Sequence, residues 1–161
     1  MLPNSRMLFL AMFLFSAGAL LAGVFIEHQY ELEPCSMCVF QRVMFIGAAL
    51  VTLAGAIQNV GAVGRRLYAV LVLLFSDIGA ALAIRQLWLQ QLPPENVPTC
   101  PPSLDYMLEV LPFTEVLQVV LSGDGNCAEV AWSMLGLSIP GWALICFVVL
   151  TFAGMAQLMR R

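Results

Sequence analysis

The sequence predicts an all-α membrane protein, built as an antiparallel bundle of four transmembrane helices with one long outer loop. The 161-residue chain is 61% hydrophobic and 11% charged, whereas soluble domains carry about 25% charged residues. It contains four long apolar stretches, and its arginines and acidic residues fall in alternate connections. The length suits one unit, so residues 1–161 are expected to form a single membrane domain.

Each predicted span holds about 20 residues, which at about 1.5 Å per residue cross a hydrocarbon core of roughly 30 Å. Backbone polar groups in lipid must be satisfied within their own segment, so each span is expected to be a helix. The first stretch resembles a signal peptide, but its apolar run exceeds the usual length of about 7–15 residues, which favours a retained anchor. The expected spans are residues 7–26, 39–57, 67–84 and 139–159.

The distribution of charge predicts the orientation. The chain has no lysine, and five of its seven arginines lie near the termini or in the turn 58–66. Nine of the ten acidic residues lie in the other two connections. Arginine-rich segments stay in the cytoplasm. Both termini are therefore expected inside, and loops 27–38 and 85–138 outside.

The long loop 85–138 contains recognisable parts. A proline-rich run around Cys100 is expected to be stiff and extended. Residues 113–121 are apolar but too short to span, so they are expected to form a short helix on the membrane surface. A turn-forming cluster at 122–126 then leads into Cys127.

A cysteine pair, Cys35-Ser-Met-Cys38, lies where the first outer loop meets the second span, and Arg42 follows four residues later. If the helix begins near Cys38, that cysteine and Arg42 share a face. The helix N-terminus and a nearby guanidinium both favour a thiolate, which is the reactive form of cysteine. The pair is therefore a redox candidate; the alternative is a packed or palmitoylated pair at the membrane boundary.

Cys100 and Cys127 form a second pair in the long outer loop. Thiols outside the cytoplasm meet an oxidising compartment, so a disulfide is expected, either as a structural crosslink or as a redox-active bond. Zinc binding by the four cysteines is a third reading, but their spacing does not match a zinc motif. No metal is expected.

Three other residues in or beside the spans have less clear roles. Arg85 is expected to extend toward the outer interface. Asp77 lies near the middle of the third span, where an acid is either functional or a hydrogen-bonded packing group. Cys146 is expected to be a small apolar residue within the fourth span.

The chain resembles the disulfide bond formation protein B family, bacterial inner-membrane thiol:quinone oxidoreductases. The resemblance covers nearly the whole chain and rests on an ordered set of motifs. These are Pro34-Cys-Ser-Met-Cys-Val-Phe-Gln-Arg42, Pro98-Thr-Cys100, Ser122-Gly-Asp-Gly-Asn-Cys-Ala-Glu129 and Trp132-Ser-Met-Leu-Gly-Leu-Ser-Ile-Pro-Gly-Trp142.

The resemblance implies an electron relay. A reduced soluble periplasmic oxidase of thioredoxin fold would attack Cys100 of a Cys100–Cys127 disulfide, and electrons would pass to Cys35 and Cys38, with a transient Cys35–Cys127 bond as one route. Cys38 would then reduce a bound ubiquinone or menaquinone, whose oxygen Arg42 would hold. Membrane lipid is an expected partner and nucleic acid is not.

Two other functions are compatible with a four-span chain that carries two cysteine pairs. Vitamin K epoxide reductases are related four-helix enzymes, but their loop cysteines precede the C-x-x-C motif, and here the motif comes first. A non-enzymatic four-span protein held together by disulfides would also explain two cysteine pairs. It predicts that losing Cys35 or Cys100 lowers stability without changing the redox state of any partner.

Overall fold

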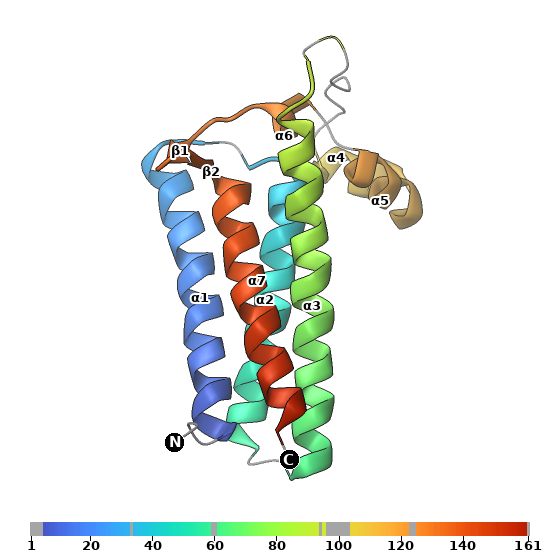
Figure 1. The fold of residues 1–161 in the computed structure, drawn as a ribbon. Coiled ribbons are helices and arrows are strands. Elements are labelled where there is room, and N and C mark those ends of the chain that lie inside the picture. The colour runs from blue at the N-terminus through green and yellow to red at the C-terminus, as the bar shows by residue number, and fades with distance from the viewer. Residues whose placement is uncertain are drawn as a thin grey trace.

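The computed structural model describes residues 5–32, 34–58, 61–93, 95, 104–122 and 125–160. Its four long helices run antiparallel, and the first begins at the same end of the bundle as the last finishes (Figure 1). Each is long and apolar enough to cross a membrane. The predicted fold class is therefore confirmed. The helices are α1 (Ser5–Gln29), α2 (Ser36–Ile57), α3 (Ala62–Leu89) and α7 (Ile139–Met159).

Three helices are longer than the spans predicted from hydropathy. The largest difference is in α3, which was expected over 67–84 and extends by five residues at each end, so the outer loop does not begin at residue 85. Hydropathy detects only the lipid-embedded part of a helix, whereas arginine and glutamine continue the helix into the interface. Only α7 matches its predicted bounds of 139–159.

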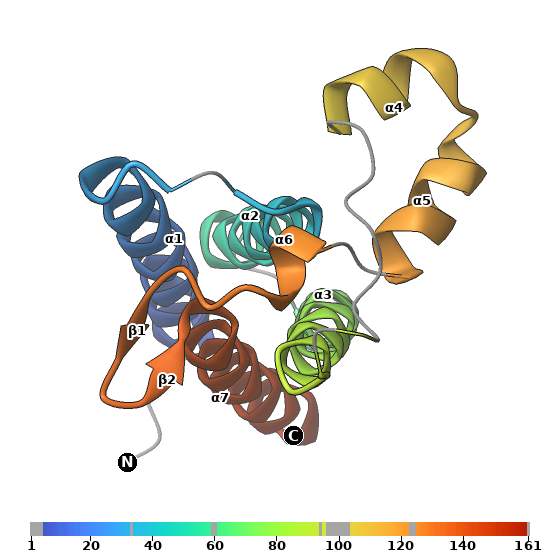
Figure 2. The same ribbon diagram turned by 90° about the horizontal axis from the view of Figure 1, so that it is seen from above.

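The outer connection carries more structure than the sequence indicated. The predicted helix at 113–121 is confirmed as α5 (Phe113–Ser122), while its position on the membrane surface stays a prediction. Figure 2 shows α4 and α5 projecting sideways from the bundle. The elements that were not predicted are α4 (Leu104–Val110), α6 (Gly125–Ala128) and the strands β1 (Ser133–Met134) and β2 (Leu137–Ser138).

The two strands form an antiparallel hairpin that leads into α7. Its turn places Leu135 at φ 55° and Gly136 at φ 80°, which is the left-handed region that glycine adopts without steric cost. Two hydrogen bonds attach the hairpin to the bundle. Ser138 Oγ donates to Gln90 Oε1 at 2.8 Å, and Trp142 Nε1 donates to the Met134 carbonyl at 3.2 Å.

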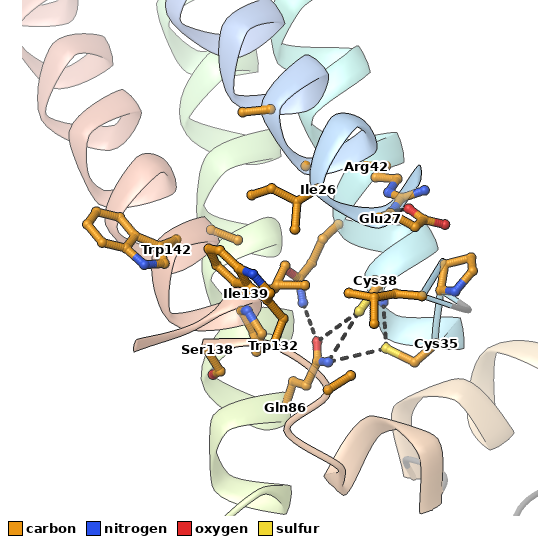
Figure 3. A pocket seen from close by; sticks show the side chains of 18 of the residues that line it. Ile26, Glu27, Cys35, Cys38, Arg42, Gln86, Trp132, Ser138, Ile139 and Trp142 are labelled. Carbon is orange, nitrogen blue, oxygen red and sulfur yellow. Dashed lines mark hydrogen bonds and ion pairs between the residues drawn. The ribbon is translucent and has the colours of Figure 1, made fainter. Parts of the chain in front are cut away.

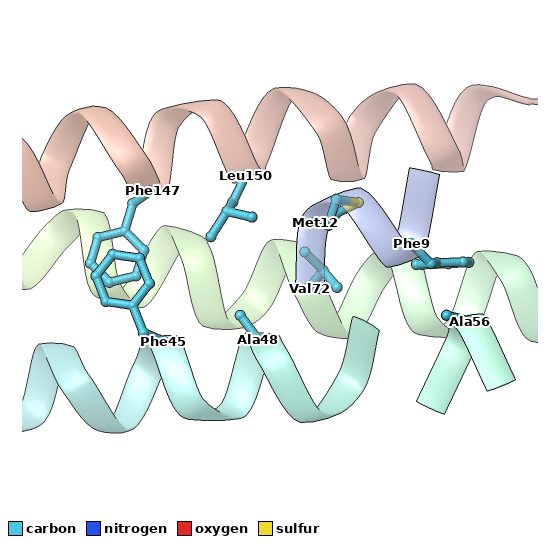
Figure 4. Packing of buried hydrophobic residues seen from close by; sticks show 8 residues of the cluster. All are labelled: Phe9, Met12, Phe45, Ala48, Ala56, Val72, Phe147 and Leu150. Atoms are coloured by element: carbon cyan, nitrogen blue, oxygen red, sulfur yellow. The ribbon is translucent and has the colours of Figure 1, made fainter. Parts of the chain in front are cut away.

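An aromatic stack lies at the centre of the bundle. The rings of Phe45 from α2 and Phe147 from α7 lie parallel, with their centroids 4.0 Å apart (Figure 4). Smaller side chains and Phe9 fill the layers between this stack and the end of the bundle where α1 begins. Many large apolar side chains instead point outward from the spans. Outward-facing apolar surface is what a membrane-embedded bundle presents to lipid.

Glycines allow aromatic rings to lie directly against neighbouring helices. Any Cβ at Gly47 would overlap the ring of Phe75, and any Cβ at Gly79 would overlap the ring of Phe147. Lipid tails are as apolar as the helices, so close van der Waals packing must supply much of the association energy. At these two positions glycine therefore lets a ring from one helix lie against the backbone of the next.

Asp77 lies midway along α3 on the outside of the bundle. Thr151 Oγ1 of α7 lies 3.1 Å from Ser76 Oγ and 2.9 Å from Asp77 Oδ1, to which its hydroxyl donates a hydrogen bond. The carboxyl group therefore has a hydrogen-bonding partner across the α3–α7 interface.

Substituting Gly79 with alanine should destabilise the bundle by about 1–3 kcal/mol, because the fully buried Phe147 ring has little room to move. Thermal unfolding of the detergent-solubilised protein, followed by circular dichroism, should show a melting temperature lower by about 2–10 °C. Gly18→Ala is the matched control, since a Cβ at Gly18 meets nothing within 4 Å. An equal loss in both variants would contradict the packing argument.

Candidate active site

The Cys35-x-x-Cys38 motif forms the first turn of α2. Cys35 is the N-cap residue, with φ −67° and ψ 160°, and its sulfur accepts a hydrogen bond from the backbone N–H of Cys38 at 3.3 Å. The helix begins at Ser36, so Cys38 and Arg42 are one turn apart in α2. The predicted start of the helix near Cys38 is confirmed. Unpaired N–H groups in this turn favour negative charge on sulfur.

Two buried glutamines connect the cysteine pair to α3. Gln86 Nε2 lies 3.2 Å from Cys35 Sγ and 3.3 Å from Cys38 Sγ (Figure 3). Gln41 Nε2 of α2 donates to Gln86 Oε1 at 2.7 Å. The exposed fractions of Gln41 and Gln86 are 4% and 2%. Buried amides need partners to offset the loss of water, and here the partners of Gln86 are the two sulfurs and the other amide.

Cys127 of α6 lies against the same turn of α2. Its side chain is completely buried, and its sulfur is 3.7 Å from Ser36 Oγ. It belongs to an apolar cluster that also contains Cys35, Leu89 of α3 and Val116 of α5. The structure therefore brings together three of the four predicted redox cysteines, Cys35, Cys38 and Cys127. Cys100 lies outside the described residues, so its pairing with Cys127 stays a prediction.

The thiol of Cys35 lies where a negative charge is disfavoured. The pKa of Cys35 is raised well above its usual range, first by hydrogen bonding to Cys127, then by hydrogen bonding to Cys38, and then by burial. A shared negative charge in this group is therefore disfavoured on Cys35. The remaining described cysteine, Cys146, lies in α7 and lines the cavity described next.

An interhelical cavity of about 310 Å³ opens beside Cys38. All four long helices and the segment around the β-hairpin contribute to its wall, which is mostly apolar. Figure 3 shows Trp132, Ile139 and Trp142 beside the cavity, with Gln86 and the cysteines at one end. Its volume is near the lower end of the range for small-molecule sites, about 300–1,000 Å³. Apolar walls with a few convergent polar groups are typical of such sites.

Arg42 forms an ion pair with Glu27 of α1. Both side chains line the interhelical cavity, and both also line a neighbouring, more polar cavity that includes His28 and Glu31. Arg42 was expected to favour the Cys38 thiolate, but the sequence did not indicate its acidic partner, Glu27. The ion pair holds the guanidinium in the cavity wall, and its charge there is already partly balanced.

Arg85, which was expected to extend toward the interface, lies over the ring of Trp88, with its guanidinium carbon 4.4 Å from the ring centroid. This is a cation–π contact at the outer end of α3. Arg42, by contrast, lines the interhelical cavity.

Three residues of this site were missed from the sequence, namely Glu27, Gln41 and Gln86. Gln41 appeared only within the motif 34–42, and Gln86 fell in a predicted loop because hydropathy ended the third span at residue 84. The available signal was an amide near the end of each of two apolar segments. Such a signal does not identify a partner, because nothing local indicates which helices face each other.

Comparisons with known proteins identify the family of the chain. Residues 5–157 match the family model described as Disulfide bond formation protein DsbB. A protein of Stutzerimonas stutzeri named Disulfide bond formation protein B is 47% identical over 160 residues, covering 99% of this chain and 98% of its own. One of the same name from Marinobacter nauticus is 48% identical over 158 residues, covering 98% and 94%.

Disulfide bond formation protein B 1 of Pseudomonas aeruginosa is 46% identical over 160 residues, covering 99% of this chain and 98% of its own. Both the match to the family model and these relatives extend over nearly the whole chain, including all four spans and the cysteine motifs. The four-span fold, the cysteine cluster and these likenesses together show that the chain belongs to the disulfide bond formation protein B family.

Proposed function

We propose that this multi-pass membrane oxidoreductase is a dithiol:quinone oxidoreductase of the bacterial inner membrane. It would reoxidise a soluble periplasmic thioredoxin-fold oxidase and deliver the electrons to ubiquinone or menaquinone. One observation carries the proposal: Cys35 contacts Cys127 of the outer segment, while its motif partner Cys38 faces an apolar cavity between the helices. One cysteine pair therefore contacts both Cys127, which would exchange disulfides, and the cavity that would hold the quinone.

The exchange steps use only the chain's cysteines and the partner's dithiol. A partner thiolate attacks Cys100 of the Cys100–Cys127 disulfide, which releases the Cys127 thiolate. Cys127 then attacks Cys35 of the Cys35–Cys38 disulfide, which releases Cys38. The partner's second thiolate displaces Cys100 from the mixed disulfide, and Cys100 in turn displaces Cys35 from Cys127. Each step exchanges one S–S bond for another, so the partner leaves oxidised and Cys35 and Cys38 remain as a dithiol.

The residues around Cys38 suit a quinone. A planar apolar ring matches the mostly apolar cavity wall, and its two carbonyl oxygens need donors, which Arg42 and the second N–H of Gln41 offer. A bound quinone supplies an acceptor for two electrons and two protons. Formation of the Cys35–Cys38 disulfide releases two electrons and two protons, so the reaction balances. The protein's contribution is position, hydrogen bonding and exclusion of water.

The distribution of arginines favours one orientation of the bundle in the membrane. The cysteine cluster lies at the end of the bundle opposite the point where α1 begins and α7 finishes (Figure 1). Arginines concentrate at the far end, which favours a cytoplasmic location for it. The cluster would then face the periplasm, where disulfides persist.

Quinone reduction by the purified protein tests the proposed function. The protein would be mixed with a reduced thioredoxin-fold oxidase and ubiquinone, and quinone absorbance followed over time. Turnover should be abolished in Cys38→Ser and in Cys100→Ser, since each removes one end of the relay. Cys146→Ser is the control variant, because Cys146 belongs to neither cysteine pair. This variant should fold and still form both disulfides. Absence of turnover with both ubiquinone and menaquinone, in folded protein with both disulfides formed, would favour the purely structural reading of the cysteines.

Replacing Arg42 with glutamine should raise the apparent quinone KM by about 10- to 100-fold, because a hydrogen bond from a charged donor contributes about 1.5–3 kcal/mol. Both disulfides should still form. The comparison variant is Glu27→Gln, which keeps the guanidinium and removes its partner's charge, and should raise the KM less. An unchanged KM in Arg42→Gln would remove that residue from the quinone site.

The contact between Cys35 and Cys127 predicts a trappable bond. In a Cys38→Ser/Cys100→Ser double variant, mild oxidation should join Cys35 to Cys127, because these are the remaining thiols in contact. Peptide mass mapping would identify the crosslinked pair. Crosslinks to Cys146 at comparable yield would contradict the arrangement of the cluster.

A further inference from the structure

The amide of Gln86 is the polar group that the cysteine motif shares with α3. Its Nε2 lies within hydrogen-bonding distance of both sulfurs, 3.2 Å from Cys35 and 3.3 Å from Cys38. A primary amide has two N–H groups, so one side chain can donate to both sulfurs at once. At 2% exposure, this amide is shielded from water that would otherwise serve the same purpose.

Gln41 determines which way the Gln86 amide points. The Gln41 amide donates to Gln86 Oε1 at 2.7 Å, so the oxygen of Gln86 faces Gln41 and its NH₂ group faces the sulfurs. The reversed orientation would place two NH₂ groups together and an oxygen against any sulfur anion. Because Gln41 is itself buried in α2, the helix that carries the cysteines also orients the donor that serves them.

The same amide pairs with Cys38 in either protonation state. As a thiol, Cys38 donates its S–H to Gln86 Oε1 at a distance of 3.8 Å. As a thiolate, it accepts from Gln86 Nε2 at 3.3 Å. A thiolate in an apolar cavity needs donors to replace lost water, and hydrogen bonds to charged groups are about twice as strong as neutral ones.

We propose that Gln86, oriented by Gln41, is a positioning residue that stabilises the Cys38 thiolate at the cavity and keeps both sulfurs of the motif on one side. This inference rests on the proposed function and deepens it. Gln86 has no titratable group, so its donation persists at every pH. Its effect is therefore distinct from that of Arg42, which acts through charge.

Other ionisable groups face the same region. Cys35 and Cys127 lie beside Cys38 from α2 and α6, and the Glu27–Arg42 pair and Glu129 line the same cavity. Any of them can influence the ionisation of Cys38, so the test must change the amides while leaving these groups in place. Substitutions at Gln86 and Gln41 meet that condition.

The experiment is site-resolved alkylation of the fully reduced, quinone-free protein. Iodoacetamide would be applied anaerobically between pH 5 and pH 10, and the rate at Cys38 read by peptide mass spectrometry. In Gln86→Leu the midpoint of the Cys38 curve should move up by about one pH unit, a roughly tenfold lower rate at a pH below the midpoint. The isosteric Gln86→Glu should move it further, since it replaces a donor with an anion. Gln41→Leu should give a smaller shift in the same direction, because the donor remains but is no longer oriented.

Gln157→Leu is the matched control. Gln157 is also a fully buried glutamine in a hydrogen-bonded pair, donating to the Ser5 carbonyl at 2.7 Å. It lies at the opposite end of the bundle, so it reports the general cost of losing a buried amide. The Cys38 midpoint should be unchanged in this variant.

Steady-state kinetics of quinone reduction separate the roles of Gln86 and Arg42 in turnover. Gln86→Leu should lower kcat for quinone reduction with little change in KM, whereas Arg42→Gln should mainly raise KM. A Cys38 midpoint that is the same in Gln86→Leu, Gln86→Glu and the unmodified protein would overturn the proposal, as would an equal shift in Gln157→Leu. The alkylation assay needs neither quinone nor partner, so a failure of the proposed function would leave this result interpretable.

Discussion

The structure depends on keeping polar groups satisfied inside an apolar bundle. A thiol pair buried at the membrane boundary cannot rely on water for hydrogen bonds, and a bare sulfur anion there would be costly. The network of Gln41, Gln86 and the Cys35–Cys38 turn answers that constraint with two amides from two helices. The helix N-terminus adds further donors. Removing any one member leaves another buried group without its partner, so the network acts as a unit.

The same constraint explains where the site lies. Cys35 is at the boundary between the loop and α2, so it can contact Cys127 from the outer segment on one side and Cys38 on the other. Moving the pair one turn deeper would separate Cys35 from Cys127. Moving it one turn outward would remove Cys38 from the cavity. The first turn of α2 is thus the position in this chain from which both neighbours are within reach.

A rigid frame holds these parts in register. Packing of Phe45 on Phe147, with Gly79 making room for the ring, fixes the spacing of α2, α3 and α7. The outer hairpin is attached to α3 by the hydrogen bond from Ser138 to Gln90. Precise placement matters because the hydrogen bonds between amide and sulfur form only over a few tenths of an ångström. The outer helices α4 and α5, which project from the bundle, instead add apolar cover to the cysteine cluster.

The sequence by itself determined the number of spans, their order and the class of fold, because length and hydropathy are local properties that a bilayer constrains strongly. It also indicated Cys35, Cys38 and Arg42 as candidate site residues, since C-x-x-C followed by arginine is a contiguous pattern. Only the tertiary structure decided which side chains contact the cysteines. Gln86 is 48 residues from Cys38, and Cys127 is 91 residues from Ser36. Contacts over such separations depend on which faces of the helices meet, and a single sequence carries no local signal for that choice.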